Sequence, residues 1–293
     1  MRKKRVAALV TALILAGSYV LFFLQLSGFG ADRLLADRRA LLLYLLPIAL
    51  LVQLIKAFRA YLIFVDTSLS MADSFLYYAQ STIVSVILPM KLGELFRIYR
   101  FGAAIGDYIG GLARILADRL VDTAALLLYL TAVLLSGSHS VFAVYIVLAA
   151  FSALLCACWI AFPSTHRFGN DYLITRRHSE KAHRALEILE RGKHIHAYLR
   201  ELFRGKLFLM FLLSLAAWGL ELMGVALFMR GGISDGEQIG NYLQSALAAG
   251  DSELQKLYAV AYVFVLTVWM LLWLTLRLVK MKRRPSDADH RSL

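Results

Sequence analysis

A proline and a glycine interrupt an apolar stretch near residue 90, and charged residues surround the interruption. Pro89, Lys91, Gly93, Glu94 and Arg97 stand within nine positions. Proline cannot continue a helix and glycine helps the chain to turn, so we expect a new half-helix to begin near Gly93. Backbone N–H groups at a helix N-terminus attract anions, and Lys91 and Arg97 add positive charge. The pattern favours a phosphate site, or an ion pair between Glu94 and Arg97 that only caps the break.

The half-helix before the break carries a face of hydroxyl groups at spacings of three and four, formed by Ser74, Tyr77, Tyr78, Ser81 and Ser85.

A second group of charged residues recurs along the stretch 104–135. Arg114, Asp118 and Asp122 are spaced four residues apart, so they share one face of a helix, and Arg119 flanks that face. Charges inside a membrane are costly and usually face a partner or a water-filled path. The group therefore lines a polar path for a headgroup, or holds helices together as a structural ion-pair network.

Three further charges lie within apolar runs. Glu221 follows Trp218 by three residues and has no basic residue near it in sequence. Such a carboxylate is protonated, is paired with a distant Arg or Lys, or relays a proton or cation. Lys56 and Arg59 lie near the end of their run, where we expect the long side chains to reach toward the interface. Either could instead pair with Glu221 or with a lipid.

Neither a metal nor a cofactor is expected. His194 and His196 are two positions apart and diverge on a helix, and Cys156 and Cys158 are interpreted as small buried hydrophobic residues.

The composition indicates a membrane protein. Of the 293 residues 60% are hydrophobic and 18% are charged, with a mean hydropathy of +0.65 and a net charge of +12. Ordinary soluble domains are about 45–50% apolar and about 25% charged. Because the basic residues lie between apolar runs, they indicate cytoplasmic loops of a polytopic protein and argue against a nucleic-acid partner.

Apolar runs long enough to cross a membrane predict the architecture, since a spanning helix needs about 20 residues. We expect an all-α, polytopic integral membrane helical bundle with about six spanning helices. The runs are 6–27, 40–65, 104–135, 141–162, 207–229 and 257–279.

Loop charges orient these helices. Segment 163–206 holds ten Lys and Arg against five acidic residues, whereas 231–255 holds four acidic residues and no Lys or Arg. Basic loops stay in the cytoplasm, so both termini and 163–206 are expected inside. Residues 66 to about 104 then begin and end on one side, which predicts a re-entrant helical hairpin at about 74–101.

The chain is expected to form a single transmembrane domain, 1–285, followed by a disordered cytoplasmic tail, 286–293. A cytoplasmic amphipathic segment is expected at about 164–206, with its helix interrupted near Gly192.

The two central motifs resemble the flippase-like transmembrane domain family of lysylphosphatidylglycerol synthases. Pro89, Gly93, Glu94 and Arg97 match its Pro-x-x-x-Gly-Glu-x-x-Arg element. A Glu-Arg-x-x-Asp element is matched at 118–122, with Asp118 in place of the usual Glu. Lys56 with Arg59, and Trp218 with Glu221, also look like family features.

The resemblance implies an inner-membrane protein that binds and translocates an anionic, aminoacylated or polyprenyl-linked lipid. No catalytic motif is found, and with only 14 residues after Val279 no soluble transferase domain is expected. The alternative is a membrane transferase, or an accessory scaffold subunit for enzymes of lipid-linked glycan or envelope lipid synthesis. The candidate substrate-binding residues are Lys91, Gly93, Glu94, Arg97, Arg114, Asp118, Arg119, Asp122 and Glu221.

Overall fold

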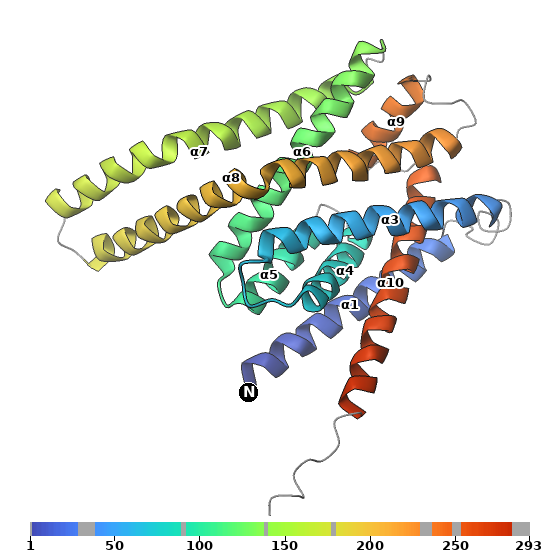
Figure 1. The fold of residues 1–293 in the computed structure, drawn as a ribbon, viewed down its shortest axis with the longest axis horizontal. Helices are drawn as coiled ribbons and strands as arrows, with labels where there is room; N and C mark the ends of the chain where they lie inside the picture. Colours follow the sequence, from blue (N-terminus) through green and yellow to red (C-terminus); the bar gives the residue numbers. More distant parts are fainter. Residues whose placement is uncertain are drawn as a thin grey trace, which may run out of the picture.

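The computed structural model describes residues 2–28, 39–88, 92–137, 140–176, 180–228, 236–247 and 253–282. Throughout these ranges the regular structure is α-helical, which confirms the all-α class (Figure 1). The helices are α1 (Arg2–Gly28), α3 (Arg39–Phe64), α4 (Met71–Ile87), α5 (Leu92–Ile105), α6 (Tyr108–Leu135), α7 (Phe142–Arg176), α8 (Glu180–Phe228), α9 (Gly236–Leu247) and α10 (Glu253–Lys282).

Five described helices are long and apolar enough to span a membrane, namely α1, α3, α7, α8 and α10. The sixth predicted crossing, α6, has 28 residues but carries more charged residues than a simple span. Every 18-residue window inside α6 contains Asp118, Arg119 and Asp122. The helix therefore departs from the composition of a simple span because it carries candidate site residues.

Helices α4 and α5 form the hairpin that the sequence predicts at about 74–101, and its position within a membrane stays a prediction. At 1.5 Å per residue α4 is about 25 Å long and α5 about 21 Å, both shorter than a hydrocarbon core of about 30 Å. The two helices come very close at Gly93, where an added Cβ would lie 2.1 Å from Ser85 Cα. Pro89 and Lys91 lie outside the described residues.

The chain reverses again between α5 and α6. Gly106 adopts φ +75° in this turn, a conformation that side chains beyond glycine rarely take. Asp107 then caps α6, since its side chain accepts a hydrogen bond from the Gly110 backbone N–H. Helices α5 and α6 consequently pack side by side, with Glu94 of α5 near Arg119 of α6.

Helix α8 corrects one prediction. It runs without interruption from Glu180 to Phe228, so the break expected near Gly192 is wrong. Gly192 instead permits close packing, because an added Cβ would lie 3.0 Å from the Phe162 ring of α7. The N-terminal half of α8, residues 180–204, is called the extension of α8; it runs beside α7, and its first turns reach beyond the other helices (Figure 1). The cytoplasmic position of 164–206 stays a prediction, and the tail 286–293 lies outside the described residues.

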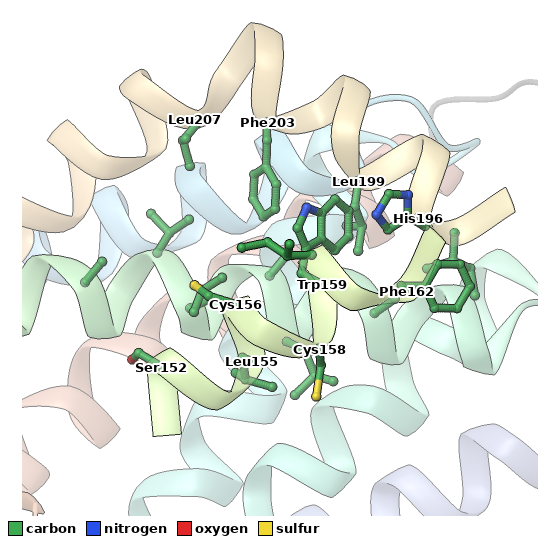
Figure 2. Close-up of a pocket in the computed structure, with 18 of the residues that line it drawn as sticks. Ser152, Leu155, Cys156, Cys158, Trp159, Phe162, His196, Leu199, Phe203 and Leu207 are labelled. Carbon is green, nitrogen blue, oxygen red and sulfur yellow. The ribbon is translucent and has the colours of Figure 1, made fainter. Parts of the chain in front are cut away.

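A groove lies between α6, α7 and α8 (Figure 2). Cys156 and Cys158 of α7 both line it and are exposed, so the prediction that they are buried is wrong. None of the residues in the apolar window of α7 is buried, which hydrophobicity alone does not reveal.

The interior contains two buried apolar clusters that meet along α3. Leu45, Ala49 and Val52 belong to the first, and Ala57 and Ile63 belong to the second. Along α3, Gln53 and Lys56 lie between these two sets, and Arg59 lies among the residues of the second set.

Candidate functional site

A stripe of polar residues on α3 organises the site. Gln53, Lys56 and Arg59 recur every three residues, and together they contact α4, α6 and α8. The hydroxyl of Tyr78 on α4 donates to Gln53 Oε1 at 2.8 Å. Because these side chains project from the side of α3 that packs against α4, α6 and α8, they lie inside the bundle rather than at its surface.

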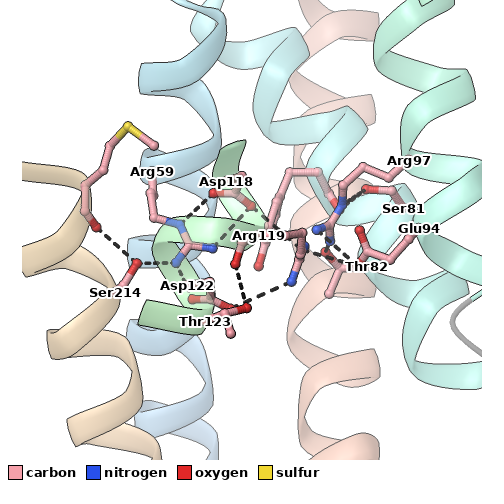
Figure 3. Close-up of polar contacts among 12 residues, drawn as sticks. Arg59, Ser81, Thr82, Glu94, Arg97, Asp118, Arg119, Asp122, Thr123 and Ser214 are labelled. Atoms are coloured by element: carbon pink, nitrogen blue, oxygen red, sulfur yellow. Dashed lines mark hydrogen bonds and ion pairs between the residues drawn. The ribbon is translucent and has the colours of Figure 1, made fainter. Parts of the chain in front are cut away.

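Arg59 is the centre of the buried charge network (Figure 3). Its Nε lies 2.8 Å from Asp118 Oδ1, and Nη2 donates to Asp118 Oδ2 at 3.2 Å. Nη1 donates to both Asp122 and Ser214. Only 3% of the Arg59 side chain is exposed, so the expectation that it reaches toward the interface is wrong. It joins α3 to α6 and α8.

A second arginine, Arg119, holds the outer edge of the same network. Its guanidinium lies 3.2 Å from Glu94 Oε1, 3.8 Å from Asp118 Oδ2 and 3.7 Å from Asp122 Oδ2. These contacts are longer than those of a well-formed charged hydrogen bond, which measures about 2.7–2.9 Å. The Arg119 side chain is 35% exposed. It is thus the accessible and loosely held cation of the group.

Arg97 ties the network to the hairpin. Its Nη1 lies 3.4 Å from Glu94 Oε1, which confirms the predicted ion pair at a spacing of three. Nε and Nη2 donate to Ser81 Oγ at 3.2 Å and Thr82 Oγ1 at 2.9 Å. The hydroxyl face predicted on the first half-helix therefore supplies Ser81. Thr82 was missed although it lies four residues after Tyr78 and so fits the same spacing.

The network is electrically balanced. Three arginines, at 59, 97 and 119, contact three carboxylates, at 94, 118 and 122, so the formal charge of the set is zero. An uncompensated charge inside a membrane costs several kcal/mol. The pairing therefore allows six ionisable side chains to share the bundle interior.

A separate ion pair joins α3 to α8. Lys56 Nζ lies 2.9 Å from Glu221 Oε2, so Glu221 adopts the alternative of pairing with a distant basic residue. The Lys56 ammonium also lies 5.1 Å from the Trp218 ring centroid. Tyr242 of α9 donates to Glu221 Oε1 at 3.1 Å, a contact that no sequence signal indicated.

Arg114 lies outside the charge network, although it shares a helical face with Asp118. Its guanidinium stands 4.2 Å from the Tyr198 ring centroid and 5.9 Å from that of Phe64. These rings come from α8 and α3. Arg114 therefore packs between aromatic residues, and its predicted place in the polar path is not supported by the contacts of the described residues.

Together these features describe a helical membrane protein whose interior holds paired charges beside a broken helix. The model of the family described as the lysylphosphatidylglycerol synthase TM region matches residues 6–232. The chain belongs to this family, and is therefore a membrane protein with relatives in lipid synthesis. The matched range includes most of α1 and all of α3 to α8, and thus every member of the Arg59 network. No curated protein and no solved structure matches the chain.

Proposed function

We propose that the protein binds the phosphate of a membrane lipid at Arg119 and moves the lipid between the two leaflets of the inner membrane. Both termini are cytoplasmic in this proposal. The observation that carries it is the position of Arg119, a partly exposed cation at the edge of an otherwise buried network. Lipids are the partners, and the protein acts as a transporter rather than as an enzyme.

Arg119 can exchange partners because each carboxylate that it contacts has another arginine. Asp118 and Asp122 keep Arg59, and Glu94 keeps Arg97. A lipid phosphate can accept two parallel hydrogen bonds from a guanidinium, which replaces three long contacts with two short ones. Binding therefore releases Arg119 without leaving any of the three carboxylates unpaired.

The hairpin supports the same position for the headgroup. Glu94 stands in the first turn of α5, directly after the break between α4 and α5. Interrupted helices with charged groups at the break are typical of substrate sites in membrane transporters. Once Arg119 has turned to a phosphate, Glu94 keeps only Arg97 and can also accept a hydrogen bond from an ammonium group on the same headgroup. This would favour a phospholipid that carries an amine.

Leaflet exchange in liposomes tests the proposal. A fluorescent anionic phospholipid is reconstituted with the protein, and its transfer is followed by adding a membrane-impermeant quencher. Arg119→Gln is expected to slow exchange about 10- to 100-fold, the range that corresponds to losing a hydrogen bond to a charged group. The matched control is Arg191→Gln, which removes an exposed arginine paired with Glu187 on the extension of α8. Exchange by Arg119→Gln at the wild-type rate would refute the assignment.

The alternatives predict other results. A membrane transferase would form product from a lipid-phosphate acceptor, with the purified protein and without leaflet exchange. An accessory scaffold would retain its partner in Arg119→Gln but lose it when the basic residues of the α8 extension are neutralised. Arg184, Arg191 and Arg200 lie on that extension.

A further inference from the structure

The groove between α6, α7 and α8 is not part of the charge network. It has a volume of about 1010 Å³. Its walls are apolar and include Leu116 of α6, Trp159 of α7 and Phe208 of α8. Figure 2 shows Trp159 of α7 beside Leu199 and Phe203 of α8. Among the described residues that line it, Arg204 is the one Lys, Arg, Asp or Glu.

Small residues create the groove. Ala113, Ala117 and Ala124 form part of the α6 wall, and Gly205 opens the α8 wall. A Cβ added at Gly205 would meet no other atom within 4 Å. The third wall is α7, in which none of the residues of the apolar window is buried. The side chains thus leave this space unfilled. Its third wall, α7, packs only weakly against the bundle.

The length of the groove suits a hydrocarbon chain. The α6 wall runs from Ile109 to Ala124, which is about 22 Å at 1.5 Å per residue. This length exceeds one leaflet of hydrocarbon, about 15 Å, so an extended chain can lie along the groove.

We propose that this groove holds one hydrocarbon chain of the phospholipid whose phosphate is bound at Arg119. The inference rests on the proposed function for the identity of the lipid. Its geometry rests on α6, where Leu116 lines the groove three residues before Arg119 and is 41% exposed. Residues three apart on a helix are neighbours on its surface, so the open edge of the groove adjoins the exposed guanidinium.

Arg204 adds charge complementarity at the α8 wall. It is exposed and lines the groove. A cation beside an apolar channel suits a phospholipid, because the chain enters the channel while the phosphate stays near positive charge. A lipid can therefore reach Arg119 with its chain already held between α6, α7 and α8.

Photo-crosslinking tests this placement with the full-length protein in liposomes. The probe is a phosphatidylglycerol that carries a diazirine within one acyl chain, and crosslinked peptides are mapped by mass spectrometry. Crosslinks are expected to concentrate at Leu116, Cys156 and Phe208. Gly205→Phe should lower these groove crosslinks about tenfold or more, because its ring occupies the space that the chain needs.

Gly17→Phe is the matched control. Gly17 also has no atom within 4 Å of an added Cβ, but it lies on α1, away from the groove. This variant should leave groove crosslinks unchanged. Crosslinks spread evenly over α1 and α10, and unaffected by Gly205→Phe, would show a general lipid annulus and overturn the proposal. Crosslinks between two copies of the chain that fill the groove would also overturn it.

The same experiment separates this inference from the proposed function. Arg119→Gln should retain groove crosslinks to a measurable degree while it slows leaflet exchange. Groove crosslinks that Gly205→Phe removes, in a protein with no leaflet exchange, would support the chain site and refute transport. Exchange that depends on Arg119 without groove crosslinks would support transport and refute the chain site.

Discussion

Removing Arg59 should destabilise the bundle more than removing any other single cation of the network. Arg59→Met takes away the guanidinium that contacts both Asp118 and Asp122, whose side chains are 8% and 12% exposed. Arg119 remains near both carboxylates, but only at 3.8 and 3.7 Å. The network charge changes from zero to −1. Leaving one buried charge without its partner costs about 3–5 kcal/mol, and this is the expected loss in the free energy of unfolding.

A compensating substitution distinguishes electrostatics from lost packing. Asp118→Asn in the Arg59→Met background returns the formal charge of the network to zero. We expect it to recover about 1–3 kcal/mol, the size of coupling measured between residues of one ion-pair network. Asp118→Asn alone should cost less than Arg59→Met, because Asp122 still neutralises Arg59. The measurement is reversible unfolding in mixed micelles, with helicity and a second probe followed together.

Arg100→Met is the matched control for this prediction. Arg100 is partly buried on α5 and donates to the neutral Gln80 Oε1 at 3.1 and 2.7 Å. Its removal strands no charge, so the expected loss is about 1–2 kcal/mol. If Arg59→Met unfolds like Arg100→Met, or if Asp118→Asn deepens the loss from Arg59→Met, the electrostatic account of the network is wrong.

Two further predictions concern the other contacts between helices. Lys56→Met should cost about 2–4 kcal/mol because Glu221 stays buried without its cation, whereas the double variant with Glu221→Gln should fall within about 1 kcal/mol of wild type. Gly93→Ala should destabilise the protein by about 1–3 kcal/mol, because its Cβ would lie 2.1 Å from Ser85 Cα and force α4 and α5 apart. Both are measured by the same unfolding assay.

Specific results would contradict the predictions for Lys56 and Gly93. A double variant as unstable as Lys56→Met would show that the side chain of Lys56, rather than its charge, supports the bundle. For the hairpin, Gly205→Ala is the control, since an added Cβ there meets nothing and alanine favours helix. The free energy of unfolding of Gly93→Ala should be well below that of Gly205→Ala. Equal stability of the two variants would refute the close approach of α4 and α5.

The helices could be predicted from sequence because their signals are local. Run length and hydrophobicity identify the five apolar spans, and Pro89 with Gly93 marks the break between α4 and α5. The continuity of α8 could not be predicted in the same way. Gly192 looks like an interruption in a single helix, but here it provides room for Phe162 of α7. The structural role of Gly192 depends on a residue of another helix, which the local sequence does not identify.

The partners of the charges were harder to predict than the charges themselves. Lys56 and Glu221 are separated by 165 positions, so a lone carboxylate indicated only that a partner exists. Arg59 was expected near the interface because it lies near the end of its apolar run. Its burial depends on which side of α3 meets α6, which the local sequence does not specify. Arg114 was expected beside Asp118, but Tyr198 from the extension of α8 packs against it. Helical spacing defines a shared face, and the neighbouring helices decide what that face contacts.

The sequence left two interpretations of the charged motifs open, a structural network and a path for substrate. The contacts assign the structural role to Arg59 and the ligand-binding role to Arg119. Arg59 is buried, touches both aspartates and Ser214, and connects three helices, so its displacement would disrupt the bundle. Arg119 is partly exposed, and every carboxylate that it contacts is also paired with Arg59 or Arg97. A ligand that competes for one arginine would therefore take Arg119, and the fold would persist while it binds.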